Sequence, residues 1–185
     1  MTIVFNGITN SINLGGTVFS GNASGLTDAP AGTILQTVVG TNGYSTNSTV
    51  DLTGSVTSPT FLDSNCKVTI TPKRSNSKIL LTWSAQIRKN ASTYGHVGIY
   101  YSPNSDMSSP TVVEKGAGPN TLTETFRSAD SAAAQWSSWS RIAWDETISN
   151  TNTRYYNVGG FAGGGNLYYG DNGVALQIMA QEISA

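Results

Sequence analysis

Very few residues in this 185-residue chain have the side-chain chemistry that catalysis needs. His96 is the only histidine, and a Ser-His-Asp device would require it as the general base. The pattern around it instead indicates an ordinary polar residue at the start of a strand. Asp145 and Glu146 are adjacent carboxylates, so on a strand they point to opposite faces and are a poor pair for cleaving a glycosidic bond. The sequence therefore predicts no catalytic residues.

Residues for cofactor and metal binding are equally scarce. A histidine-based zinc site fails for want of ligands, and the single Cys66 cannot form an internal disulfide. We expect Cys66 to be a buried or half-buried strand residue. The glycines between positions 159 and 165 are not followed by Lys-Ser/Thr, so a flexible turn or a close chain crossing explains them better than a phosphate loop. No cofactor and no metal are expected.

A cluster of aromatic residues has two interpretations. Exposed rings beside Asn and Asp would suit sugar binding, because an aromatic ring stacks on the face of a sugar. Packing in the core or in a subunit interface is the interpretation we favour, because aromatic side chains dominate burial. The candidate surface-binding or interface aromatics are Trp136, Trp139, Trp144, Tyr155 and Tyr156, and the cluster also includes Tyr168 and Tyr169.

Charge is low, since 11% of the residues are charged and the formal net charge is -1. A protein that binds nucleic acid needs clustered Lys and Arg to displace counterions. The 10 Lys and Arg residues here are scattered, and Lys73-Arg74 is their densest group. No apolar run approaches the roughly 18 residues of a membrane helix. We therefore expect neither nucleic-acid binding nor membrane insertion.

The rest of the composition indicates a folded protein with a polar, uncharged surface. The 4 Trp and 8 Tyr, together with many Val and Ile, supply enough burial to argue against disorder, and the 20 Gly suit frequent turns. Such surfaces suit extracellular or virion proteins. The N-terminus lacks a basic segment followed by an apolar stretch, which is the pattern of a secretory signal peptide. We therefore expect synthesis in a host cytoplasm and release on a virion by lysis.

Apolar and polar residues alternate along most of the chain, which predicts strands rather than helices. Residues 78–88 are apolar enough for the middle of a sheet, and at most one helical turn is expected, over residues 128–135. Strands are expected at 33–39, within 52–62, and at 66–71, 78–88, 96–101, 135–142, 153–158, 166–169 and 174–183. This number and spacing of strands predict an all-β, antiparallel β-sandwich or jelly roll.

Residues 1–32 differ from residues 33–185, which form the expected β-sandwich head domain. The first segment has almost no charge, and Gly and Asn divide its apolar residues into pieces too short to build a core alone. A solvated tail would not carry Phe5, Ile8, Leu14, Val18 and Phe19. We therefore expect an extended N-terminal arm that becomes ordered on a partner surface and anchors the protein there.

Several strand and turn segments resemble the head modules of bacteriophage tail-fibre and related virion proteins. AGTILQTVV at 31–39 resembles their opening strand, and AQEI at 180–183 resembles their closing strand. ITP at 70–72 followed by SKIL at 77–80 resembles their central hairpin. FNG at 5–7 and GNASGL at 21–26 resemble short linking repeats of fibre N-termini. The resemblance implies a jelly-roll head that is usually homotrimeric.

Two functions follow from this resemblance, and both place the protein on the virion surface. In the first, it is a non-enzymatic capsid cement or decoration protein, and its arm lies along neighbouring subunits of a major capsid or tail protein. In the second, it is a short tail fibre whose head binds a host receptor such as a surface glycan. The absence of a shaft favours the first function, whereas the resemblance favours the second. A secreted lectin would need an export signal.

Overall fold

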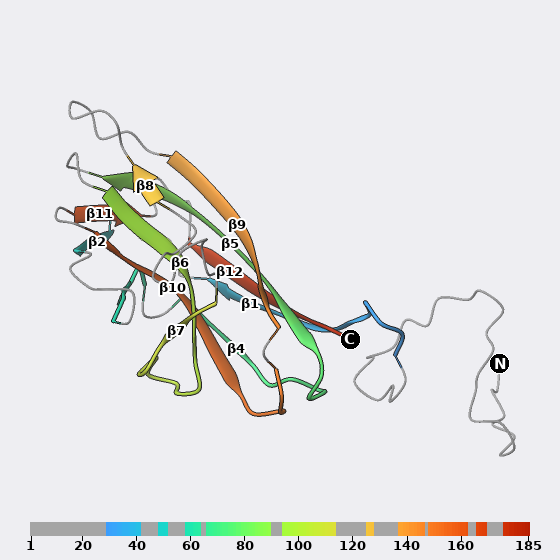
Figure 1. The fold of residues 1–185 in the computed structure, drawn as a ribbon. Coiled ribbons are helices and arrows are strands. Elements are labelled where there is room, and N and C mark those ends of the chain that lie inside the picture. Colours follow the sequence, from blue (N-terminus) through green and yellow to red (C-terminus); the bar gives the residue numbers. More distant parts are fainter. Residues whose placement is uncertain are drawn as a thin grey trace, which may run out of the picture.

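The computed structural model is all-β, as Figure 1 shows. It describes residues 29–41, 48–51, 58–63, 66–89, 94–113, 125–127, 137–146, 148–162, 166–169 and 176–185. Within these ranges every strand pair is antiparallel and no helix occurs. The predicted all-β fold with antiparallel sheets is confirmed. The described residues contain no helix that is long and apolar enough to cross a membrane.

One sheet is organised around its central strand β5 and is called the β5 sheet below. On one side of β5, β12 pairs with residues 78–84 and β11 with residues 87–89, while β9 pairs along residues 79–87. β1 then pairs with β12, and β2 pairs with β11. Its strands are β1 (Ile34–Thr41), β2 (Ser48–Asp51), β5 (Lys78–Lys89), β9 (Ser137–Asp145), β11 (Asn166–Tyr169) and β12 (Gln177–Ile183).

The other sheet, called the β10 sheet, has β10 and β6 at its centre. β10 pairs with β4 and β3 at one edge and with β6 at the other. β6 in turn carries β7 and β8. Its strands are β3 (Thr60–Phe61), β4 (Lys67–Ile70), β6 (Tyr94–Ser102), β7 (Thr111–Val112), β8 (Thr125–Arg127) and β10 (Arg154–Ala162).

The two sheets share one hydrophobic core because every second residue of their strands points inward. Every second residue of β5 points inward and is buried, and the residues between them point outward. The residues of this core include Ile79, Leu81, Trp83, Ala85 and Ile87 from β5, Val97 and Ile99 from β6, Tyr156 and Val158 from β10, and Val68 and Ile70 from β4. Residues 78–88, which are apolar enough to be predicted in the middle of a sheet, thus form its central strand and bury one side against the β10 sheet.

The predicted hairpin between residues 70–72 and 77–80 is wrong. β4 pairs with β10, whereas β5 pairs with β12, β9 and β11, so these consecutive strands lie in different sheets. The residues between them cross from one sheet to the other. Pro72, which is buried in this connection, has no backbone N–H to donate to a ladder. A short polar connection looks alike in sequence whether it closes a hairpin or links two sheets.

The glycine-rich segment begins inside a strand, because β10 continues past Val158 to Ala162. Gly159 pairs with both Phe61 and Gly98, and a Cβ atom at position 159 would lie 2.9 Å from Cδ1 of Phe61. The close chain crossing expected as one alternative is therefore confirmed at Gly159. Residues 163–165 lie outside the described ranges, as do residues 52–57 of the predicted strand within 52–62.

Candidate interaction surfaces

The predicted anchoring residues Phe5, Ile8, Leu14, Val18 and Phe19 lie outside the described ranges, as does Trp136. From Ala29 onward the chain is bonded to the head. The amide of Gly32 donates to the carbonyl of Ser184 at 2.8 Å, and the amide of Ser184 donates to Thr33 at 2.9 Å. Arg74 Nη1 and the Ser184 hydroxyl both donate to the carbonyl of Ala29, at 3.4 and 3.1 Å.

The other four predicted aromatics lie in different environments. Tyr156 is fully buried in the shared core, and Trp139 is partly buried against that core. Tyr155 packs on the outer side of the β10 sheet, where Lys67 lies over its ring. Trp144 alone of the four is exposed, on β9. The sequence identified aromatic residues but could not separate the exposed one from those that pack.

Three rows of residues on the outer side of the β5 sheet contain no charged residue. Strand register places Val39, Met179, Thr82 and Ile142 in one row across β1, β12, β5 and β9. The next row contains Thr37, Gln181, Leu80 and Trp144, and a third contains Gln177, Ser84 and Ser140. These three rows are called the uncharged face. The Lys78–Glu146 ion pair, with Nζ and Oε1 3.0 Å apart, lies next to it.

The uncharged face also carries most of the large hydrophobic side chains that the described residues leave exposed. Val39 is 58% exposed, Ile142 64% and Trp144 47%, and Ile34 at the start of β1 is 50% exposed. Beside Val39 the face has a hollow of about 270 Å³, called the face hollow. Its lining includes Val39, Thr82, Ser84, Ser140, Gln177 and Met179. Such a surface is typical of an interface core, which is depleted in charge and enriched in aromatic residues.

Part of the outer side of the β10 sheet is covered by a loop of the same chain. Tyr100 is fully buried there beneath this loop, residues 103–110, in which Met107 is also buried. The ring of Phe61 meets that of Tyr100 edge-on, with centroids 6.0 Å apart. Met107 and Ser109 have positive φ angles of 60° and 54°, a conformation that side chains other than glycine adopt rarely.

Hydrogen bonds of Ser108 hold this loop in place. The hydroxyl of Ser102 donates to the carbonyl of Ser108 at 2.6 Å, and the amide of Ser108 donates to Asp106 Oδ1 at 2.9 Å. The hydrogen bonds from the Ser108 side chain and amide lower the pKa of the Asp106 carboxyl, because they favour its charged form. The covered side thus depends on a short segment with defined backbone geometry.

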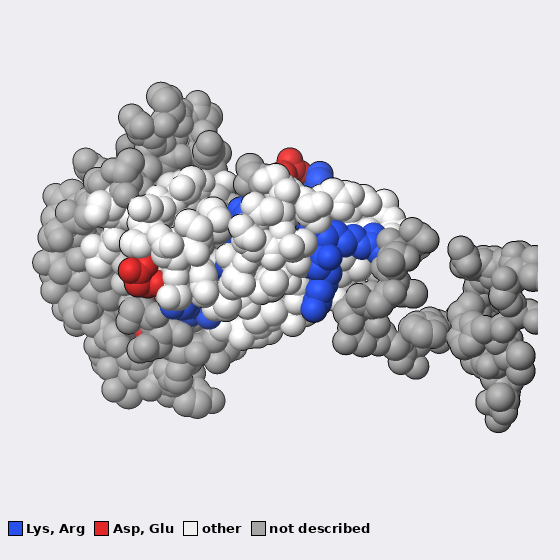
Figure 2. Space-filling model, turned by 90° about the horizontal axis from the view of Figure 1, so that it is seen from below, with Lys and Arg blue, Asp and Glu red and all other residues white. Residues whose placement is uncertain are grey.

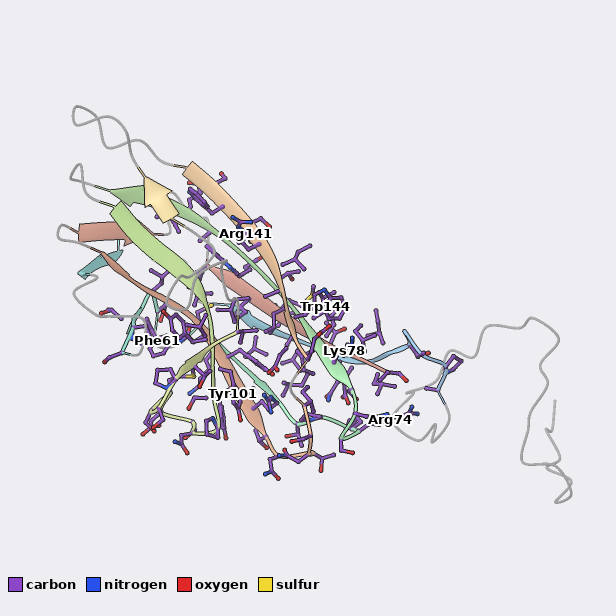
Figure 3. All side chains as sticks on the ribbon, viewed as in Figure 1. Phe61, Arg74, Lys78, Tyr101, Arg141 and Trp144 are labelled. Carbon is purple, nitrogen blue, oxygen red and sulfur yellow. The ribbon has the colours of Figure 1, made fainter. Side chains whose placement is uncertain are left out.

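A groove of about 480 Å³ opens between the edges of the two sheets. It is lined by Tyr101, Thr111, Val112, Val113, Trp144, Asp145 and Glu146. The β7 side supplies mainly aliphatic atoms, and the β9 side supplies the indole of Trp144. Figure 3 shows Trp144 beside Lys78 on the same part of the head, with Tyr101 on the facing sheet.

At the groove, a buried polar network joins the two sheets. Arg154 Nη2 donates to Asp145 Oδ2 at 2.7 Å, and the Tyr156 hydroxyl donates to the same oxygen at 2.7 Å. Arg154 Nε donates to the Tyr156 oxygen at 2.9 Å, and its guanidinium lies 3.9 Å from the centroid of Tyr101. Burial, reinforced by the Asp145 charge, raises the pKa of Tyr156, so its hydroxyl stays protonated.

The charges at the groove are balanced in pairs. Asp145 is buried and bonded to Arg154, whereas Glu146 is exposed and bonded to Lys78. The two adjacent carboxylates thus differ in burial, although both line the groove and Glu146 lies one residue beyond the end of β9. With each carboxylate matched by a cation, the groove suits a neutral ligand that has an apolar face, such as a sugar ring.

Glu182 is a buried carboxylate that the sequence analysis missed. Its Oε1 accepts hydrogen bonds from the amides of Lys73 and Arg74, at 2.7 and 3.1 Å, and from the Ser77 hydroxyl at 2.6 Å. Its Oε2 accepts a hydrogen bond from Gln36 Nε2 at 2.6 Å. Glu182 thus holds the connection between β4 and β5 to the closing strand. Alternation with Ile178 and Ala180 would have placed this side chain inward.

Cys66 and His96, the other residues considered for chemistry, both lie in the folded head. Cys66 is fully buried, and its Sγ lies 3.3 Å from the carbonyl oxygen of Leu176. His96 is paired with Phe161 and Thr125 in the β10 sheet. Among the described residues, no group of three or more His, Cys, Asp and Glu side chains could hold a metal ion. On one side of the head, Figure 2 shows a mostly uncharged surface, with Lys and Arg densest toward the C-terminal end.

Comparison with models of known protein families gives no match, and comparison with curated protein sequences gives none.

Proposed function

We propose that this chain is a non-enzymatic structural protein of a bacteriophage virion surface, a homotrimeric capsid cement or decoration protein anchored to neighbouring subunits by its N-terminal arm. The observation that carries the proposal is the uncharged face, because exposed Val39, Ile142 and Trp144 lie together on a surface without charge. Fully burying one such side chain contributes about 1.5–3 kcal/mol. A head with this face gains stability when copies cover it.

The strand order supports a jelly-roll head. β1, β12, β5 and β9 are neighbours in one sheet, and β4, β10 and β6 are neighbours in the other. Along the chain β4, β5 and β6 alternate between the sheets, as do β9, β10 and β11. Alternation between two packed sheets is also a feature of jelly rolls, an architecture that viral capsid domains and lectins use.

The first test of this proposal is oligomeric state. Mass photometry of the full chain at micromolar concentration should give trimers, and a purely monomeric protein would remove the basis of the proposal. The second test is location. Tagged protein added to particles that lack it should appear on the capsid surface in electron micrographs. Binding to the tail tip alone would favour the fibre function instead.

The arm can be tested separately. Removing residues 1–28 leaves Ala29, whose carbonyl is bonded to Arg74 and Ser184, in the protein. The truncated head should melt cooperatively and still form trimers, but it should no longer join particles. Particle occupancy equal to that of the full chain would show that the arm is not the anchor.

The second candidate function, a short tail fibre whose head binds a host glycan, is favoured by the groove. Trp144 and Tyr101 provide aromatic surface, Thr111 a hydroxyl and Glu146 a carboxylate that can accept sugar hydroxyl hydrogen bonds. Neutral monosaccharides titrated in the millimolar range should change tryptophan fluorescence, and Trp144→Ala should abolish the change. Ile142→Ala, on the same strand, is the matched control. No change with any neutral sugar would exclude this function for the groove.

A further inference from the structure

We propose that, in the assembled protein, the β9 edge of one head inserts Ile142 into the face hollow of the next head, so that each copy uses two different halves of its uncharged face. This inference rests on the proposed homotrimer and specifies how its copies meet. The inserting half is β9, and the receiving half is formed mainly by β1, β12 and β5.

The inserting half is suited to enter a neighbour. Among the described residues β9 pairs with β5 alone, so its other edge carries no described strand. Ile142 is the most exposed large hydrophobic residue in the described part of the chain, and Trp144 projects beside it from the same side of the strand. Ser138 and Ser140 also point to this side, so nothing charged flanks Ile142 within the uncharged face.

The receiving half offers a matching space. The face hollow measures about 270 Å³, whereas a water molecule takes up about 30 Å³ in the liquid, so an aliphatic side chain fits. Val39 and Met179 give it apolar walls, and Thr82, Ser84 and Gln177 are neutral polar residues at its other sides. An aliphatic group from a neighbour would therefore meet no unpaired charge there.

The absence of charge also decides what kind of partner fits. A copy of the same chain presents a face without charge, so either half can meet the other without burying an unpaired charge. At the border of the face Lys78 and Glu146 are paired with each other. Exposed Arg141, next to Ile142 in the chain, belongs to the opposite side of β9, in register with Trp83. A neutral, apolar centre with a polar border is the arrangement found in stable interfaces.

The positions of the two halves favour a ring. Val39 and Ile142 stand in one row but three strands apart, which is about 14 Å at the usual spacing of strands. A contact in which different halves of the face meet is heterologous, and such contacts close into rings when the rotation allows. Three copies related by a three-fold axis would each insert one Ile142 and receive another.

Cysteine cross-linking of the full-length protein tests this contact. The double variant Val39→Cys/Ile142→Cys should form covalent trimers under mild oxidation, whereas each single variant should form none. Within one copy the two positions are too far apart for a disulfide, which needs Cα atoms within roughly 7 Å. The only native cysteine, Cys66, is fully buried and should not interfere. Thr69→Cys/Ile142→Cys is the matched control, because exposed Thr69 lies on the outer side of the other sheet.

Each result is decisive. Covalent trimers from the double variant alone would support the inference. Covalent dimers as the end product, or cross-linking of Ile142→Cys by itself, would show a two-fold contact and overturn it. If mass photometry gives trimers that do not cross-link, this contact is wrong while the proposed homotrimer stands. If the uncross-linked protein is monomeric, both proposals fail.

Discussion

On the outer side of the β10 sheet, Tyr100 is covered by Met107 from the same chain, whereas on the uncharged face Val39 and Ile142 stay exposed. Both surfaces come from strands with the same alternating pattern. The difference lies in a loop that places Met107 over Tyr100 at the cost of positive φ angles, on the order of 1 kcal/mol each. One sheet face is thus covered by local chain geometry, whereas the other is left available to another subunit.

The largest expected loss of stability comes from a change at Tyr100, on the outer side of the β10 sheet that the loop at 103–110 covers. Tyr100→Ala should lower the free energy of unfolding by about 3–5 kcal/mol, because it empties a buried ring site under Phe61 and Met107. Chemical denaturation measures this loss. Tyr100→Phe is the matched control and should cost less than about 0.5 kcal/mol, since no described atom bonds the buried hydroxyl. Equal losses in both variants would mean that the hydroxyl, not the ring, stabilises this side.

A second change adds volume to the covered side instead of removing it. Gly159→Ala would place a Cβ atom 2.9 Å from the Phe61 ring and within 3.2 Å of the Thr60 carbonyl. The ring and the β3 backbone must shift, so we expect a loss of about 1–3 kcal/mol in the free energy of unfolding. Thermal melting would reveal it, and a melting temperature equal to that of the unmodified protein would show that Phe61 moves freely.

A charged substitution on the uncharged face should weaken association between copies and leave the folding of the head unchanged. Ile142→Asp should weaken trimer formation at least tenfold, which corresponds to about 1.4 kcal/mol, because a carboxylate would enter an apolar contact. Mass photometry over a concentration series measures this shift. Thr69→Asp on the opposite side should leave association unchanged. If Ile142→Asp destabilises the isolated head instead, the face is part of the fold and not an interface.

The smallest effect concerns the loop that covers Tyr100. The pKa of Asp106 is lowered in the folded protein, so its contribution to stability is present above its unfolded pKa of about 3.9. That contribution is lost as the pH falls through the lower folded pKa. Asp106→Asn should therefore reduce the melting temperature slightly at neutral pH, and the difference should vanish in strong acid. A difference that persists at all pH values would contradict this.

Local patterns predicted the strands well, but pairing depends on distant residues. Residues 78–88 were predicted as a central strand because the segment is rich in apolar residues. The same segment was wrongly paired with residues 70–72, because nothing in 72–77 distinguishes a hairpin from a crossing between sheets. Pairing is decided by contacts such as that of Glu182 with the Lys73 amide, more than a hundred positions away.

The candidate surfaces were less predictable than the strands. Trp139 and Trp144 lie on the same strand, yet Trp139 packs against the core and Trp144 is exposed. Successive residues of β9 point to opposite sides of the sheet, so Trp139 and Trp144 point to different sides. Which of the two is buried can be deduced only when the strand and its inward side are known. The network of Arg154, Tyr156 and Asp145 was not predicted, although Tyr156 was a candidate aromatic, because Asp145 reaches the other two from the opposite sheet.

The bonding at residue 29 has a mechanical consequence. The chain enters β1 at the end of the head that also carries the C-terminus (Figure 1). If the arm holds the head on a particle, drag on the head pulls along the axis of β1. The pairs from Ile34–Ile183 to Thr41–Gln177 would then share the load in shear instead of peeling apart one at a time. Under flow, the weakest point of the assembly would be the arm's grip on the particle, and the head would come away folded.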